Sequence, residues 1–239
     1  MKRSKSEETR GRWLGFIFKC LLEGIDTAKD IANRAAIVWG LNPRAALNSL
    51  AGYLRYLEKE GFIEGRGRRP RRYHLTPYGA FVILSVVRIY NIRELLSEDE
   101  VLNGIVRQAP KLAPIVYGYQ RLRPLIPRDE EEEEEESEEY RLLDGIYIAK
   151  ELEKEELEPV EWSSLENFIV DPIVKFLRDG EEGEVAAFVE KLSKLQLKTV
   201  ERAYVEAALA KVREAVEEEA RMLEEEAQIL RSRAKLLRL

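Results

Sequence analysis

Side chains suited to binding anions are concentrated between residues 44 and 72 of this 239-residue chain. Five arginines fall within seven positions of a glycine-containing stretch, at Arg66, Arg68, Arg69, Arg71 and Arg72. A guanidinium group forms paired hydrogen bonds with phosphate or guanine, and an asparagine amide does so with adenine. The chemistry that these residue types offer is recognition of a polyanion.

A helix is predicted just upstream, from Pro43 to about Gly61, and it separates basic from apolar positions. The predicted buried stripe consists of Leu47, Leu50, Leu54 and Leu57. At about 100° per residue, the opposite side carries basic, amide and small residues. These are Arg44, Ala45, Asn48, Gly52, Arg55 and Lys59. Small residues in the middle of this side would let the helix backbone approach the edge of a ligand closely.

The elements that must position these residues are predicted as three helices and a hairpin. Apolar residues recur at helical spacing from Arg12, and Gly24 ends this first helix. Thr27 and Asn42 are the expected N-caps of the second and third helices. Residues 62–75 are predicted to form two short strands around the arginine-rich loop.

Three helices followed by a hairpin with a basic tip is the order of a winged helix-turn-helix. Residues 54–63 (LRYLEKEGFI) and 72–79 (RYHLTPYG) resemble the corresponding segments of winged-helix regulators of the PadR/MarR type. The resemblance covers about residues 10–95. It implies a DNA-binding regulator that acts as a homodimer, with Arg44, Asn48 and the hairpin arginines as contact residues. We recognise no family in residues 96–239.

The predicted fold is mainly α. We expect a winged-helix domain with its connecting helix, a helical connector, an acidic linker and an α-helical assembly domain, at residues 1–96, 97–128, 129–139 and 140–239. The connecting helix, Tyr78 to about Leu96, is apolar nearly all round and must be buried on more than one side. Either a second protomer or the downstream helices would cover it. In residues 140–198, short helices are expected to break at Pro159, at Pro172 and at 180–183.

The last predicted helix runs without proline or glycine from about Lys198 to Leu239. Within it a large apolar residue recurs every seven positions, at Leu209, Val216, Leu223, Leu230 and Leu237, with Met222, Ile229 and Leu236 widening the face. Alanine follows four residues later, at Ala220, Ala227 and Ala234. This seam is typical of a coiled coil, and its alanines suit an antiparallel hairpin or a dimer. The pattern leaves open whether the helix pairs within or between chains.

Charge is unevenly distributed. Residues 1–79 hold 16 Lys and Arg against 8 Asp and Glu, whereas residues 80–239 hold 23 against 37. The basic end, which includes an expected loose arm at residues 1–10, is the candidate for a polyanion. The acidic end is the candidate for assembly or for a protein partner through the C-terminal helices.

Several function classes are disfavoured by composition. One Cys and one His exclude an intrachain disulfide and a Cys/His zinc cluster, and Cys20 is expected to be a buried structural thiol. No phosphate loop or nucleophile–base pair is visible, so we expect no enzyme, no cofactor and no metal. The apolar runs are shorter than the roughly 20 residues of a membrane span, which indicates a cytoplasmic protein with no membrane partner. Abundant charge and few amides are typical of thermophile proteins.

These observations lead to one expected function and two alternatives. We expect a sequence-specific transcriptional regulator that binds double-stranded DNA as a homodimer. One alternative is an architectural or segregation-type DNA-binding protein whose long helices build larger assemblies. The other is an adaptor that binds protein through the winged helix. Arg55 and Lys59 also fit a plain solvated helix face, and the acidic run fits either a linker or a segment that folds back on the basic domain.

Overall fold

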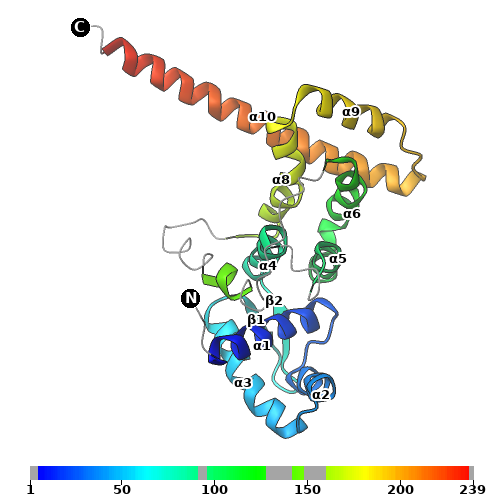
Figure 1. The fold of residues 1–239 in the computed structure, drawn as a ribbon, viewed down its shortest axis with the longest axis vertical. Coiled ribbons are helices and arrows are strands. Elements are labelled where there is room, and N and C mark those ends of the chain that lie inside the picture. The colour runs from blue at the N-terminus through cyan, green and yellow to red at the C-terminus, as the bar shows by residue number, and fades with distance from the viewer. Residues whose placement is uncertain (1–4, 91–95, 128–141, 148–159, 237–239) are drawn as a thin grey trace. The chain divides into compact units, whose positions relative to one another are not determined.

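The computed structural model describes residues 5–90, 96–127, 142–147 and 160–236 (Figure 1). These residues are mainly helical and include one small antiparallel sheet of two strands, which confirms the predicted mainly α class. They group into two compact units. The first is Met1–Leu112 with Glu130–Leu165, and the second is Ala113–Asp129 with Glu166–Leu239.

The first unit holds the basic segment. Its elements are α1 (Lys5–Leu22), α2 (Ala28–Trp39), α3 (Pro43–Lys59), β1 (Ile63–Arg66), β2 (Arg72–Leu75), α4 (Pro77–Tyr90), α5 (Glu98–Gln108) and the short η1 (Pro110–Leu112). The expected loose arm at residues 1–10 is wrong for residues 5–10, which are helical. Two arginines of α1 form cation–π contacts with other helices. The guanidinium carbon of Arg10 lies 4.3 Å from the ring centre of Tyr56, and that of Arg12 lies 4.5 Å from the ring centre of Trp39.

The second and third helices begin where the sequence predicts. The Thr27 hydroxyl accepts a hydrogen bond from the Asp30 backbone N–H at 3.2 Å, which caps α2. The Asn42 side chain accepts from the N–H groups of Arg44 and Ala45 at 2.9 and 3.4 Å, which caps α3. Both caps satisfy backbone donors that a helix leaves unpaired at its start, so they fix the first turn of each helix.

The buried stripe of α3 differs from the prediction at one residue. Leu50, Leu54 and Leu57 are buried as expected, but the fourth buried residue is Ala46, and Leu47 is 38% exposed. Positions 46, 50, 54 and 57 form a continuous row at helical spacing, and Leu47 lies at its edge. The placement of Leu47 in the core was therefore wrong.

This difference gives a stability prediction. Leu54→Ala should lower the free energy of unfolding by about 2–5 kcal/mol, because it leaves a cavity in the core. Leu47→Ala is the matched control on the same helix and should cost under about 1 kcal/mol, since its side chain already meets solvent. Chemical denaturation of both variants measures the difference. Equal losses would contradict the packing of α3.

A two-stranded hairpin follows α3. β1 pairs with β2 in antiparallel register from Ile63 opposite Leu75 to Arg66 opposite Arg72. Gly67 closes the tip with a φ of 78°, a conformation that glycine adopts without strain. Arg72 also forms an isolated β-bridge with Thr27, so the second strand is tied to the start of α2.

The apolar helix α4 is covered by elements of its own chain. Val82, Ile83 and Val86 are buried. α4 packs against α5, and a side chain at Gly145 in the helical turn 142–147 would clash with Val86. The sequence predicts that either a second protomer or the downstream helices cover this apolar helix. Within the described residues, downstream helices cover it.

The predicted end of α4 at about Leu96 depends on residues 91–95, which lie outside the described ranges. The helix reaches Tyr90, and Leu96 is buried but not helical. The next residue, Ser97, has an extended backbone and caps α5, so Leu96 lies between two helices. The Ser97 hydroxyl accepts from the Glu100 N–H, and the Ser97 N–H donates to the Glu100 carboxylate at 2.7 Å. These two hydrogen bonds form a capping box at the start of α5.

The capping box makes part of the stability dependent on pH. The hydrogen bond from the Ser97 N–H lowers the pKa of Glu100 below its ordinary value of 4.5. A carboxyl group whose pKa is lower in the folded chain stabilises the fold while ionised, and this contribution is lost as the pH falls through the folded pKa. Glu100→Gln should therefore be less stable than the native chain at pH 7 and approach it at acid pH, in chemical denaturation at both values. A difference that does not change with pH would contradict this role.

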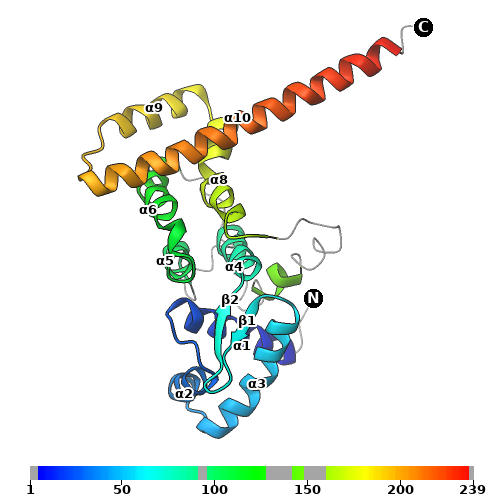
Figure 2. The same ribbon diagram turned by 180° about the vertical axis from the view of Figure 1, so that it is seen from behind.

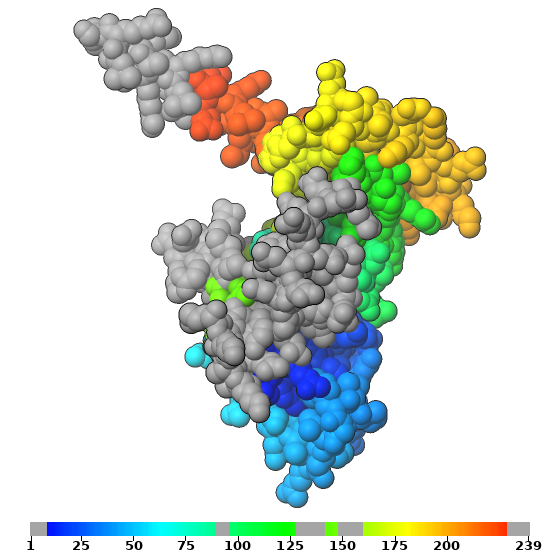
Figure 3. Space-filling view, viewed as in Figure 1, coloured from blue at the N-terminus to red at the C-terminus, as the bar shows by residue number. Residues whose placement is uncertain are grey.

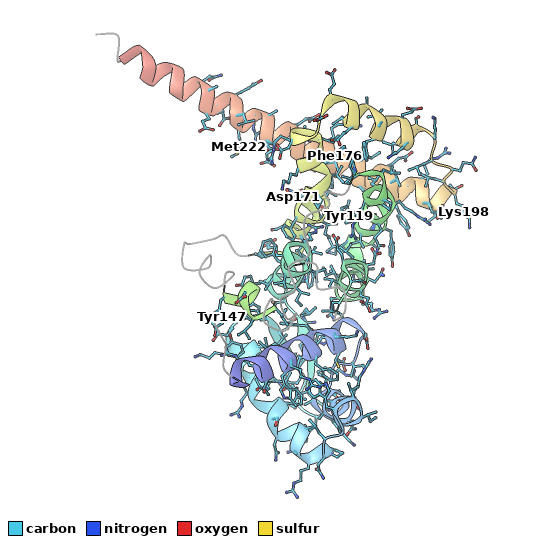
Figure 4. All side chains as sticks on the ribbon, viewed as in Figure 1. Tyr119, Tyr147, Asp171, Phe176, Lys198 and Met222 are labelled. Atoms are coloured by element: carbon cyan, nitrogen blue, oxygen red, sulfur yellow. The ribbon has the colours of Figure 1, made fainter. Side chains whose placement is uncertain are left out.

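The second unit is built on α6 and α10. Its elements are α6 (Ala113–Leu122), η2 (Arg123–Leu125), most of α8 (Ser164–Asp179), α9 (Glu182–Ser193) and α10 (Thr199–Leu236). Gly118 allows α6 to lie against the backbone of α10, since a Cβ there would clash with the carbonyl oxygen of Tyr204. On α10, Val205, Ala208 and Val212 are buried. On α8, Phe176 (labelled in Figure 4) contacts Phe188 of α9, and their ring centres are 5.6 Å apart.

Helix α8 continues through a residue where a break was predicted. Pro172 lies inside it, so the expected break there was wrong. Buried residues flank the proline on both sides, at Ile169, Val170 and Ile173. Their packing offsets the backbone hydrogen bond that proline cannot donate. The predicted break at Pro159 lies outside the described residues.

Helix α10 is continuous, as predicted, but its two halves differ in packing. The first half packs on α6, whereas Val216, Met222 and Leu223 are 38%, 63% and 57% exposed. Figure 2 shows this second half extending beyond α8 and α9. The side chains of Leu230, Ala234 and Leu237 lie outside the described residues, so the coiled coil stays a prediction. Within the part of the chain that the structure describes, no helix is long and apolar enough to cross a membrane.

Candidate nucleic-acid interface

The predicted recognition residues of α3 share one exposed side of the helix. Arg44, Ala45, Asn48, Arg55 and Lys59 are all exposed. The cap at Asn42 fixes the start of this helix, and the buried row on the other side fixes its rotation. In the middle of the exposed side, a Cβ at Gly52 would meet no atom within 4 Å. The helix therefore presents cations towards its two ends and open space between them.

The five hairpin arginines are exposed but do not form one uniform group. Three pair with carboxylates of the first unit: Arg66 with Glu64, Arg71 with Glu58, and Arg72 with Asp26. The Arg72 guanidinium donates to both Asp26 oxygens, at 2.9 and 2.8 Å, and this hydrogen bonding raises the pKa of Arg72. A cation held by a carboxylate attracts a phosphate less than a free one does.

Arg71 and Arg72 thus hold the hairpin in place. The Glu58 carboxylate accepts from Arg71 and from the Gly65 N–H at 3.1 Å, so it joins α3 to β1 and to the residue just before β2. Arg72 and the Tyr73 N–H bind the side chain and the carbonyl of Asp26, just before α2. The orientation of the hairpin relative to α2 and α3 is set before any ligand binds.

The remaining cations are available to a ligand. Within the described residues, Arg44, Lys59, Arg68 and Arg69 form no ion pair, and Arg55 donates only to the Ala51 carbonyl of its own helix, at 3.1 Å. So many like charges on one small unit raise the potential over this surface. We call these five residues the open cation set.

Sequence reasoning missed a hollow beside the exposed side of α3. It measures about 480 Å³ and is lined by Arg10, Ser49, Gly52, Tyr53 and Tyr56. Tyr53 stacks on Trp13 with ring centres 5.8 Å apart. The signal that was available is the i, i+3 spacing of Tyr53 and Tyr56, which places both rings on one side of α3.

An exposed apolar patch at the junction of α2 and α3 was also missed. Ile37, Val38, Leu41 and Leu47 are 82%, 59%, 41% and 38% exposed. The buried face of α2 is formed by Ile31, Ala32, Ala35 and Ala36, which leaves Ile37 and Val38 outside it. We call these four residues the apolar patch.

The other residues with potential chemistry have structural surroundings. Cys20 is 1% exposed, and burial raises the pKa of its thiol to about 12, so it is the buried structural thiol that the sequence predicted. No group of His, Cys, Asp and Glu side chains in the described ranges is arranged to hold a metal ion. Comparison with protein-family models, curated proteins and solved structures gave no match. The surface of the first unit must therefore be interpreted from its own chemistry.

Proposed function

We propose that this chain is a transcriptional regulator that binds double-stranded DNA as a homodimer, through a winged helix-turn-helix formed by α1–α3 and the β-hairpin. The observation that supports it most is the open cation set. Its members lie on the exposed side of α3 and at the hairpin tip, two elements that Glu58 joins rigidly. Rigid presentation lowers the entropy cost of binding.

The two parts of this surface have different tasks in the proposal. The exposed side of α3 enters the major groove, where Arg44 and Asn48 read guanine and adenine. Ala45 and Gly52 permit the close approach. Arg68 and Arg69 bind phosphates, or a narrow minor groove, beside it. In a two-fold dimer, two such helices would meet successive major grooves about 34 Å apart.

The test of sequence recognition is selection from a pool of randomised duplexes by the full chain. The proposal expects enrichment of an inverted repeat, bound at least about 1,000-fold more tightly than unrelated DNA. Binding without enrichment would overturn the regulator and support the architectural alternative. Absence of binding at low salt would overturn both.

Releasing an arginine from its carboxylate should strengthen the interaction with DNA. Asp26→Asn removes the charge that Arg72 faces but keeps a hydrogen-bond acceptor. We expect a few-fold tighter binding at low salt and a steeper dependence on salt, because one more cation then meets the phosphates. Fluorescence anisotropy with a labelled duplex measures both. The control is Asp171→Asn on α8, which changes net charge equally in the second unit and should leave affinity nearly unchanged.

A second candidate function rests on the apolar patch. Groups of exposed apolar side chains are typical of protein-binding sites, and these four residues, which fall between positions 37 and 47, lie on the same unit as the open cation set. The alternative is an adaptor that binds another protein here. Duplex affinity, measured for the native chain and for Ile37→Ser with Val38→Ser, separates the two functions. The DNA proposal expects both chains to bind the duplex equally well. An adaptor would bind no duplex in either form.

A further inference from the structure

The apolar stripe of α10 is covered along one half of the helix and uncovered along the other. Val205, Ala208 and Val212 are buried in the packing with α6. Towards the C-terminal end of α10, the same stripe continues with Val216 and Leu223, and both of these side chains are exposed. The space-filling view shows the orange part of α10 projecting beyond the side chains of α8 and α9 (Figure 3), and Met222 lies on this part (Figure 4).

The heptad register assigns the residues of this open half. With Leu209, Val216, Leu223 and Leu230 at position d, the alanines at 220, 227 and 234 take position a. For residues 229–236 the assignment rests on the sequence register of a helix that runs to Leu236. Each heptad thus offers one large and one small residue to a partner helix.

An antiparallel second copy matches this pattern of large and small residues. In an antiparallel pair, each a residue lies opposite a d residue of the partner. When Ala227 faces the partner's Leu230, Leu223 faces the partner's Ala234. Every layer then joins one leucine with one alanine, so the two backbones approach closely and evenly.

The charges beside the seam select the same arrangement. Residues 224–226 are all glutamate, and basic residues follow at Arg231, Arg233 and Lys235. In the antiparallel register, Glu224 lies beside the partner's Arg231 and Glu226 beside the partner's Arg233. In a parallel pair, Glu226 would also lie beside the partner's Arg231, but Glu224 would lie beside the partner's Glu219. Like charges at such positions disfavour a pairing, and opposite charges favour it.

We propose that two copies of this chain associate through the second half of α10, in antiparallel orientation, with Ala227 opposite the partner's Leu230. The partner is a second copy because the reversed arrangement, unlike the parallel one, places both Glu224 and Glu226 beside arginines of the same helix. The inference specifies the interface of the proposed homodimer and does not depend on DNA binding. Loss of duplex affinity alone leaves it standing, whereas a monomeric native chain overturns it together with the dimeric form of the proposed function.

Charge reversal tests the pairing by sedimentation of the full chain at micromolar concentration. Glu224→Arg with Glu226→Arg should weaken the dimer at least tenfold, since arginines then face arginines. Adding Arg231→Glu and Arg233→Glu to the same chain should restore it. The matched control is Glu218→Arg with Glu225→Arg, which changes net charge equally on the outer side of the helix and should have little effect. A monomeric native chain, or equal effects of the two double variants, would overturn the proposal.

Spin labels test the orientation. Cys20 is buried with a pKa raised to about 12, so a label reacts at an introduced cysteine instead. Two labels at Glu214→Cys should lie about 40 Å apart in an antiparallel dimer and about 10–15 Å apart in a parallel one, at a rise of 1.5 Å per residue. Labels at Gln228→Cys, close to the two-fold axis, should be near each other in both. A short distance at position 214 would overturn the antiparallel assignment.

Discussion

Replacing Arg68 and Arg69 together by alanine will weaken duplex binding at least tenfold at moderate salt and lower the salt dependence. In the proposed function these two guanidinium groups neutralise phosphates, and neither forms an ion pair within the described residues. Each lost phosphate contact reduces the slope of log affinity against log salt by about 0.9. The double variant should therefore lose nearly two units of slope, for every duplex sequence alike.

The control uses an arginine from the same hairpin that has a carboxylate partner. Glu64→Ala with Arg66→Ala removes both members of an exposed ion pair and leaves the net charge unchanged. The pair is a surface one, so folding should be affected little. Affinity and salt slope should stay near the native values. If both double variants weaken binding equally, the distinction between open and paired arginines is wrong.

The second large effect concerns stability: Gly118→Ala will destabilise the second unit by about 2 kcal/mol or more. A Cβ at Gly118 would clash with the Tyr204 carbonyl oxygen and lie 2.7 Å from Cβ of Ala208. These neighbouring atoms belong to the backbone and to a short side chain of a packed helix, so α6 and α10 must separate to make room. Overpacking of this kind costs about 1–3 kcal/mol, and more where backbone has to move.

The same substitution on α9 provides the control. A Cβ at Gly183 would meet no atom within 4 Å, so Gly183→Ala should be neutral or stabilise by up to about 1 kcal/mol. Far-UV circular dichroism during denaturation follows both units. Tryptophan fluorescence reports the unfolding of the first unit alone, because all three tryptophans, at positions 13, 39 and 162, belong to that unit. Equal stability of the two alanine variants would contradict the close packing of α6 on α10.

Local signals were enough to predict the helices of the first unit. Thr27, Asn42 and Ser97 have side chains that cap helices through neighbours two or three residues away, so the sequence contains the whole interaction. Position 47 was not predictable in this way. Its burial depends on which side of α3 meets the core, and Ala46, a weak apolar signal, occupies the core in its place.

The candidate site was predictable in residue type but not in electrostatic state. All ten predicted contact positions are exposed. The partners of Arg71 and Arg72 are 13 and 46 residues away in sequence, and only the tertiary fold brings them together. For the same reason, periodicity predicted an apolar seam on the last helix but not where α6 stops covering α10.

The most direct test of the central claim is the affinity of the full chain for a labelled duplex, measured by anisotropy across a range of salt concentrations. The open cation set has five members per chain, so the slope of log affinity against log salt should be about −4 or steeper. A slope near zero, or no binding at the lowest salt, would show that this surface does not bind DNA.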